Sequence, residues 1–344
     1  MDWKFVDSVL EKYRQQYSAE QNDLKDDLEN ELIKYGKITD LYGIVSDNDL
    51  SRFKRFLERN EEYIKENDYC NYKVDKIKNK KRIKYKEMLD IIILVLFTKF
   101  QKEIYPKRYD TLAEIGSNVY SSTIKECEKL GHKPVGKIPL LDDLLILYLL
   151  LPNEKGTTYQ EQNNAQTIYN AEQISKQVTI DIMSSITPDI RADRYTLMFD
   201  RFKRQEINKK KDQNQKDKYS GIIDDQSTFV SNQIKLELFK IYGFNYCEFI
   251  GIEDERQTEM CKSLSGQMFN LTELNVYSRY SSLDKADIVY HTIGMVVGEN
   301  LPPITNHKHA CRSFIMPVES AVEIANENKW YIWKYKKTNT MPKL

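Results

Sequence analysis

Apolar and charged residues alternate along most of this chain at the spacing of an amphipathic helix. Near the start, Leu24, Leu28 and Leu32 recur at every fourth position among charged neighbours. Gly36 follows, and glycine suits the left-handed residue that commonly ends a helix. The pattern predicts a long amphipathic helix before residue 36.

A second apolar stripe follows Ser46. Its hydroxyl is placed to cap a helix, with Asp49 three residues on. We expect this helix to continue through Ile64 and to end before Tyr69. The stripe consists of Leu50, Phe53, Leu57 and Ile64.

The two longest apolar runs, Ile91–Phe97 and Leu144–Leu151, are far shorter than the roughly 20 residues that cross a bilayer. We interpret both as buried core helices. The first is expected to end before Pro106, because proline disrupts a helix interior, and a further helix is expected over 112–130. Glycine and proline at 131–136 predict a loop.

Helical periodicity resumes over 157–208, with a break at Ser185–Pro188. The next segment, 208–220, is rich in Lys, Asp, Gln and Asn, so we expect a mobile loop that buries little surface. A further helix is predicted to end at Gly243. Its apolar face is made by Val230, Ile234, Leu238 and Ile241.

Three short segments near the C-terminus have the aromatic and branched residues of strands: Tyr246–Ile252, Met268–Phe269 and Phe314–Met316. The predicted fold class is therefore mainly α. An N-terminal helical region is followed by further helices and a small α+β C-terminal module with a short antiparallel sheet.

Length favours more than one compact unit in a chain of 344 residues. We expect a helical N-terminal region over 1–155 and a helical connector with a mobile basic loop over 156–218. The α+β core is expected over 219–318, followed by a tail over 319–344.

Charge and cysteine content indicate which partners and which redox compartment to expect for the chain. Acidic and basic residues balance at 52 each, so the chain lacks an overall field that would attract nucleic acid. Five scattered cysteines argue against a secreted disulfide scaffold and for a reducing compartment. No signal peptide opens the sequence.

Basic residues nevertheless concentrate in two runs, Lys73–Lys86 and Arg201–Lys218. Such runs are usually solvated helix faces or connectors. The alternative is contact with DNA phosphates. That alternative assigns the contact to Lys78, Lys80, Lys81 and Arg82.

Two separated signatures dominate the C-terminal third. The first contains Asp254, Arg256, Thr258, Cys261, Leu264 and Gly266. The second contains Pro302, Pro303, His309, Cys311 and Arg312. Together they resemble the core pattern of the phage head morphogenesis family, the Mu F-like minor head proteins. The resemblance does not cover the first 155 residues.

The resemblance implies that the two signatures meet in one folded site. Asp254 and Arg256 flank the turn after the first strand and Arg312 lies beside Cys311, so folding would bring a carboxylate against a guanidinium and fix the loop geometry. The alternative for these residues is an ordinary surface ion pair. Gly266 would end a short helix that contains Cys261, and the proline pair would form a rigid approach.

Convergence would also gather four groups of the kind that bind zinc: Cys261, His307, His309 and Cys311. Two departures from the family pattern, however, favour packed thiols or a disulfide over a closed zinc site. One residue separates His309 from Cys311 where the family usually has two, and Thr258 stands where some members carry a cysteine. We therefore expect no cofactor, with zinc as the open alternative.

Ordinary catalytic motifs are absent from the sequence, including a phosphate-binding loop, a His-Glu-x-x-His helix and a Gly-x-Ser-x-Gly elbow. Two isolated histidines, His132 and His291, are interpreted as packed or surface imidazoles. An alternative enzyme hypothesis is a Mu F-associated toxin of ADP-ribosyltransferase type, since Glu253-Asp254-Glu255 has a Glu-x-Glu spacing. That triplet lies within the head-protein signature.

The resemblance implies a non-enzymatic minor capsid protein that binds the portal and supports head morphogenesis, packaging or DNA ejection. Its expected partners are the portal protein, the scaffold or major capsid protein, and packaged DNA, with no membrane. The expected location is the host cytoplasm during procapsid assembly and then the interior of the virion head.

Overall fold

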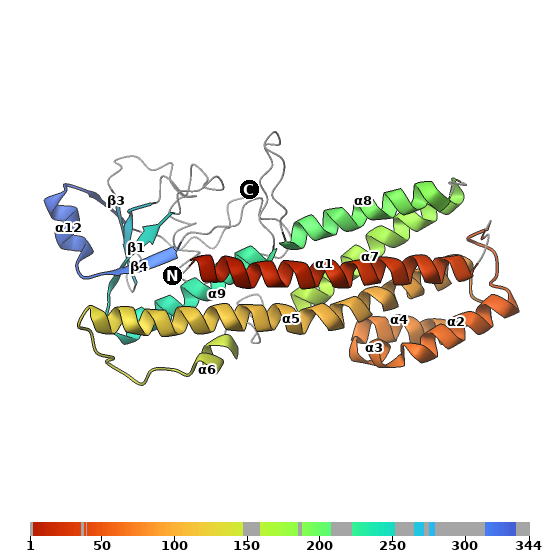
Figure 1. Ribbon diagram of the computed structural model, residues 1–344, viewed down its shortest axis with the longest axis horizontal. Coiled ribbons are helices and arrows are strands. Elements are labelled where there is room, and N and C mark those ends of the chain that lie inside the picture. Colours follow the sequence, from red (N-terminus) through yellow and green to blue (C-terminus); the bar gives the residue numbers. More distant parts are fainter. Residues whose placement is uncertain are drawn as a thin grey trace. The chain divides into compact units, whose positions relative to one another are not determined.

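The structure is a computed structural model, and it describes residues 3–35, 38, 40–146, 159–184, 188–207, 222–251, 265–271, 275–278 and 314–334. These residues are mainly helical and contain one small antiparallel sheet near the C-terminus, which confirms the predicted fold class (Figure 1). No described helix is both long enough and apolar enough to cross a membrane.

Two compact units divide the chain, and neither is continuous in sequence. The first comprises Met1–Leu10, Asp110–Tyr159 and Lys209–Leu344, and the second comprises Glu11–Tyr109 and Gln160–Asn208. This division differs from the linear boundaries expected at 155, 218 and 318. The helices α1 (Trp3–Lys34) and α5 (Tyr85–Lys129) each contribute to both units. Two of the boundaries between the units therefore lie inside a continuous helix, where no change in sequence composition marks them.

The second unit is entirely helical among its described residues. Besides parts of α1 and α5, it contains α2 (Asp47–Arg59), α3 (Glu61–Glu66), α4 (Asp68–Lys78), α7 (Tyr159–Met183) and α8 (Pro188–Ile207). The predicted break between two helices near residue 185 is confirmed. One hydrophobic cluster spans these helices, with side chains such as Phe53, Phe97, Ile174 and Phe199.

A buried polar network crosses this apolar core. Arg108 of α5 pairs with Glu206 of α8 at 2.6 Å. The Tyr13 hydroxyl of α1 donates to the same carboxylate at 2.7 Å and accepts from Arg108 Nε at 3.1 Å. A buried charge needs such partners, so the network fixes three helices in register.

The predicted cap at Ser46 is confirmed, because its hydroxyl accepts from the backbone N–H of Asp49 at 3.2 Å. The expectation of one helix ending before Tyr69 is wrong. Breaks occur at Asn60 and Asn67, and the Asn67 side chain caps α4 by accepting from the backbone N–H of Cys70 at 2.9 Å. Asparagine is a strong N-cap residue, which explains where α4 begins.

The expected end of a helix before Pro106 is also wrong, since α5 runs through this residue. Proline costs about 3 kcal/mol inside a helix. Here Ile104 precedes it and Leu112 and Ile115 follow it, all at most 4 % exposed. Apolar burial on both sides therefore outweighs the local penalty and joins two expected helices into one.

The described part of the first unit contains the sheet, whose order is β4-β1-β2-β3-β5 with every pair antiparallel. Its strands are β1 (Tyr246–Ile250), β2 (Met268–Asn270), β3 (Asn275–Ser278), β4 (Phe314–Val318) and β5 (Tyr331–Lys334). The three strands expected from the sequence correspond to β1, β2 and β4. The expected tail instead contributes α12 (Ala321–Glu327) and β5, which completes the sheet beside β3.

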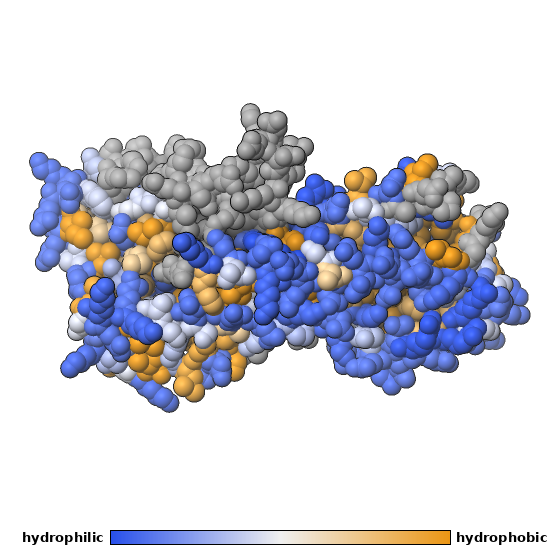
Figure 2. Space-filling view, in the orientation of Figure 1, coloured by the Kyte–Doolittle hydropathy of each residue, from blue (hydrophilic) through white to orange (hydrophobic). Residues whose placement is uncertain are grey.

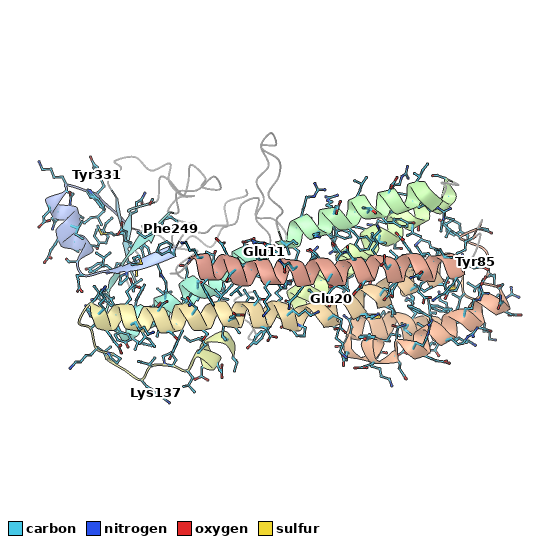
Figure 3. The ribbon with its side chains drawn as sticks, in the orientation of Figure 1. Glu11, Glu20, Tyr85, Lys137, Phe249 and Tyr331 are labelled. Atoms are coloured by element: carbon cyan, nitrogen blue, oxygen red, sulfur yellow. The ribbon has the colours of Figure 1, made fainter. Side chains whose placement is uncertain are left out.

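Helix α9 (Ile222–Ile241) packs against this sheet. Gly243 follows it with φ +80°, as expected for the residue that ends the helix. The shared cluster comprises Cys127, Leu236, Phe239, Tyr242, Phe244, Cys247, Phe249, Phe269, Leu271 and Ile315. Figure 3 shows Phe249 within the sheet, where its ring is completely buried. The sheet therefore rests on a rigid helical support.

Further elements lie near this module. The loop expected at 131–136 is confirmed, and Gly131 has φ +85°. A short helix, α6 (Leu141–Leu145), covers the start of the second apolar run. The remainder of that run and the mobile loop expected at 208–220 lie outside the described residues.

Candidate functional site

The two strands that flank the signatures are neighbours in the sheet. β1 leads through Gly251 into the first signature, and β4 begins directly after the second. Their antiparallel register pairs Ile250 with Phe314. The residue before one signature and the residue after the other therefore lie side by side at one end of the sheet.

The far end of the first signature returns to the same place. The backbone N–H of Gly266 donates to the Phe249 carbonyl at 2.8 Å, and the Gly251 N–H donates to the Ser265 hydroxyl at 3.2 Å. Gly266 has φ +82°, a conformation that glycine adopts without strain. The first signature thus begins and ends at one closed loop base.

A buried lysine on α9 contacts the start of β4. Lys235 of α9 is 1 % exposed, and its Nζ donates to the Ile315 carbonyl at 3.1 Å. The same ammonium lies 4.7 Å from the centre of the Phe314 ring, within cation–π range. Burial lowers the pKa of Lys235 to about 8, against smaller opposing effects from Glu126, Cys247 and Cys127.

His132 provides a second tie on this module. Its Nε2 lies 2.7 Å from Glu319 Oε1, just after β4, and its Nδ1 lies 3.1 Å from the Tyr242 carbonyl oxygen. The ring stacks on Phe244 at 4.0 Å. His132 is therefore the packed imidazole that was expected, and its contacts fix the loop after β4 against α9.

The three described cysteines, Cys70, Cys127 and Cys247, are free and buried. Burial raises the pKa of Cys70 to about 11 and that of Cys127 to about 12, and it also raises the pKa of Cys247. A thiol with a raised pKa is a poor nucleophile and a poor metal ligand. These residues fill the apolar core.

Of the predicted site residues, the structure describes only Gly266 and the basic group. The remaining signature residues lie outside the described ranges: Asp254, Arg256, Thr258, Cys261, Leu264, Pro302, Pro303, His307, His309, Cys311 and Arg312. The predicted ion pair and the choice between zinc, disulfide and packed thiols therefore stay predictions. Within the described ranges, no cluster of three or more His, Cys, Asp or Glu residues could hold a metal ion.

The predicted DNA-contact residues lie at the junction of α4 and α5, and all four side chains are exposed. Lys80 is neutralised by an ion pair with Glu87. Lys81 and Arg82 form no ion pair with any described residue. The loop is also held in place, because Ile44 and Lys84 form a β-bridge and the Val45 N–H donates to the Ile83 carbonyl at 2.9 Å.

Sequence reasoning missed the supporting residues Lys235 and Glu319. A lysine within the helical stripe of α9 has no local signal of burial, since its environment is made by β4 and by α5. Glu319 meets His132 across a large sequence separation. Both contacts depend on tertiary packing that periodicity alone does not specify.

Comparison with known proteins finds no match: no family model matches the chain, and no curated protein or solved structure matches it. The signature residues and the geometry of their flanking strands are the features of the chain that bear on its function.

Proposed function

We propose that this chain is a minor head protein of a tailed phage or prophage. It would act without catalysis inside the procapsid, binding the portal protein and supporting head morphogenesis and genome packaging or delivery. Scaffold or major capsid protein and packaged DNA are the further proposed contacts. The proposed location is the host cytoplasm during assembly and then the head interior.

The main support is the pairing of Ile250 with Phe314. The resemblance requires two distant signatures to form one site, and this register joins their flanking strands. If the two short motifs matched the family pattern by chance, nothing would require their flanking strands to pair. The sheet geometry is therefore the arrangement that the proposed family assignment needs.

Contacts with α9 and at the loop base make this end of the sheet suitable for docking a partner protein. The Lys235 ammonium donates a hydrogen bond to the Ile315 carbonyl, and the Gly266 N–H donates one to the Phe249 carbonyl at the loop base. A rigid base lowers the entropy lost when a surface loop binds a partner. The proposed portal contact is thus made by loops that emerge from a preorganised end of the sheet.

Co-purification tests this proposal. The tagged chain would be produced with the portal protein encoded by the same phage or prophage, and complex formation measured by pull-down and size-exclusion chromatography. We expect a complex, weakened by the double substitution Asp254→Ala, Arg312→Ala. The exposed Arg204 on α8 supplies a control, Arg204→Gln, which should leave the complex intact.

The toxin alternative gives a different result in the same preparation. An ADP-ribosyltransferase would consume NAD, and Glu255→Gln would abolish that consumption. NAD turnover that depends on Glu255, without portal binding, would replace the head-protein assignment. Portal binding by a protein that does not consume NAD supports the assignment.

A further inference from the structure

A hollow of ≈ 580 Å³ lies in the second unit, between the end of α1 and one face of α2. It contains none of the residues of the two signatures. The lining residues are Glu31, Lys34, Tyr35, Arg52, Arg55, Glu58 and Arg59. Four of these seven carry a positive charge and two carry a negative one.

The arginines share one face of α2 because of their spacing. Arg52, Arg55 and Arg59 follow an i, i+3, i+7 pattern, which keeps side chains on one side of a helix with 3.6 residues per turn. The opposite side buries Phe53, Phe56 and Leu57 in the core. Burial of that apolar stripe fixes the rotation of α2 and directs the guanidinium groups into the hollow.

Only some of these cationic side chains form ion pairs with carboxylates of the described residues. Glu31 pairs with Lys34 at 2.6 Å and with Arg59 at 3.4 Å. Arg52 Nη1 donates to the Lys34 carbonyl at 2.5 Å and lies 3.7 Å from Asp49. Arg55 forms no ion pair with any described residue, and its Nε donates only to the Ser51 carbonyl at 3.4 Å. Its terminal nitrogens are therefore available to a ligand.

Tyr35 adds a neutral donor to the same hollow. The residue is only 4 % exposed, yet it lines the hollow, and its hydroxyl has no hydrogen-bond partner among the described residues. Burial, followed by the charges of Glu31 and Asp49, raises the pKa of the Tyr35 hydroxyl to about 12. The hydroxyl thus stays protonated at neutral pH and can donate to an anion.

We propose that this hollow binds a phosphate group. The lining residues carry two more positive charges than negative ones, with Asp49 beside Arg52, so the hollow favours an anion such as a phosphate monoester, which carries about −1.5 to −2 at neutral pH. Guanidinium groups donate in a planar fork that suits phosphate oxygens. A single carboxylate has half this charge and fewer oxygens, so it uses the donor set less completely.

Two sources can supply the phosphate group: a free phosphorylated compound, whose monoester carries the charge given above, and the backbone of a nucleic acid, whose diester carries a single negative charge. The exposed loop at Lys81 and Arg82 is joined to the start of α2, because the Tyr85 hydroxyl donates to Asp49 at 2.7 Å. Figure 3 labels Tyr85 at this end of the unit, and Figure 2 shows the surface over α2 to α4 as largely hydrophilic. A backbone phosphate in the hollow would lie near this second group of cations.

Calorimetric titration of the full chain with pyrophosphate tests the proposal. Arg55→Gln should weaken binding about ten-fold or more, since a hydrogen bond to a charged group is lost. Tyr35→Phe should weaken it several-fold without unfolding the protein, because the ring is retained. Arg204→Gln is the matched control: Arg204 is also exposed and also donates from Nε to a carbonyl four residues back.

Loss of binding in the Arg55 and Tyr35 variants with retention in the control supports the proposal. It is overturned if pyrophosphate does not bind, if Arg204→Gln weakens binding as much as Arg55→Gln does, or if only an acidic peptide binds. Once binding is established, competition by a short DNA duplex assigns a nucleic acid as the source. Failure of the duplex to compete assigns a free phosphorylated compound.

Discussion

Ile250 and Phe314 are directly paired across β1 and β4, although the two signatures and the residues between them separate them in sequence. This pairing limits how far apart the signature cysteines can lie. Cys261 is four residues from Ser265, and Cys311 is three residues from Phe314, so fully extended chain adds at most about 14 Å and 11 Å. Chain length alone therefore sets an upper limit on the distance between these two cysteines.

Lys235 gives the clearest pH dependence. Its folded pKa of about 8 lies below the unfolded value of 10.5, so the unfolded chain binds more protons between these values. The contribution of Lys235 to stability therefore rises with pH, by about 1 kcal/mol from pH 7 to 9. Lys235→Met should lose this rise. Urea unfolding of both proteins at pH 7, 8 and 9 measures it.

The comparison stops at pH 9 because Cys70, Cys127 and Cys247 have raised pKa values, so stability falls as the unfolded thiols ionise near that pH, and only the difference between wild type and variant reports on Lys235. A constant difference in unfolding free energy between wild type and variant would show that Lys235 does not change protonation on folding.

Gly266→Ala should destabilise the protein by about 1–2 kcal/mol, because φ +82° is unfavourable for alanine. An added Cβ would lie 3.7 Å from Glu248, an ordinary contact, so the penalty comes from the backbone alone. Gly136→Ala is the control, since nothing lies within 4 Å of its added Cβ and its φ is not positive. Equal effects at both glycines in denaturant unfolding would contradict the role of the loop base.

Glu206→Ala should cost about 3–5 kcal/mol, since it removes the buried carboxylate that pairs with Arg108 and accepts from the Tyr13 hydroxyl. The control is Glu11→Ala, because Glu11 lies on α1 with 59 % of its side chain exposed and should change stability by less than about 0.5 kcal/mol. Figure 3 labels Glu11. Thermal and urea unfolding of both variants provide the measurement. Similar stability of the two variants would exclude a structural role for the buried network.

The basic loop between α4 and α5 has a separate test. If it contacts DNA phosphates, Lys81→Gln combined with Arg82→Gln should lower affinity and reduce the salt slope by about 2. Lys80→Gln should have a smaller effect, because Lys80 is already paired with Glu87. Fluorescence anisotropy with duplex DNA at several salt concentrations measures the slope. An unchanged slope in the double variant would reject this contact.

Local signals in the sequence identified most of the helices and three of the strands. The Ser46 cap, the break near residue 185 and the glycine after α9 depend on neighbouring residues, so periodicity and capping chemistry located them. The continuity of α5 through Pro106 depends on packing from other helices, which overrides propensity. The strands β3 and β5 are four residues each and gain their stability from pairing with one another.

The residues of the candidate site also differ in whether a local signal in the sequence identified them. Gly266 was identified from its motif and has a positive φ, whereas the short helix expected before it lies outside the described residues. Lys235 was not identified, because its buried partners belong to β4 and become neighbours only in the folded chain. The arginines of α2 were also missed, since Arg52, Arg55 and Arg59 resemble an ordinary solvated face until the fold places Tyr35, which follows α1, beside them.

Convergence of the two signatures is tested most directly by the distance between Cys261 and Cys311. Cys70, Cys127 and Cys247 are free and buried, so mild oxidation of reduced, chelator-treated protein should join only the two signature cysteines, and mass spectrometry of its peptides identifies the linked pair. We expect Cys261 linked to Cys311 within one chain, at a rate that does not depend on protein concentration. Thiols at the two positions that stay separate, or that link only between chains, would show that the signatures do not form one site.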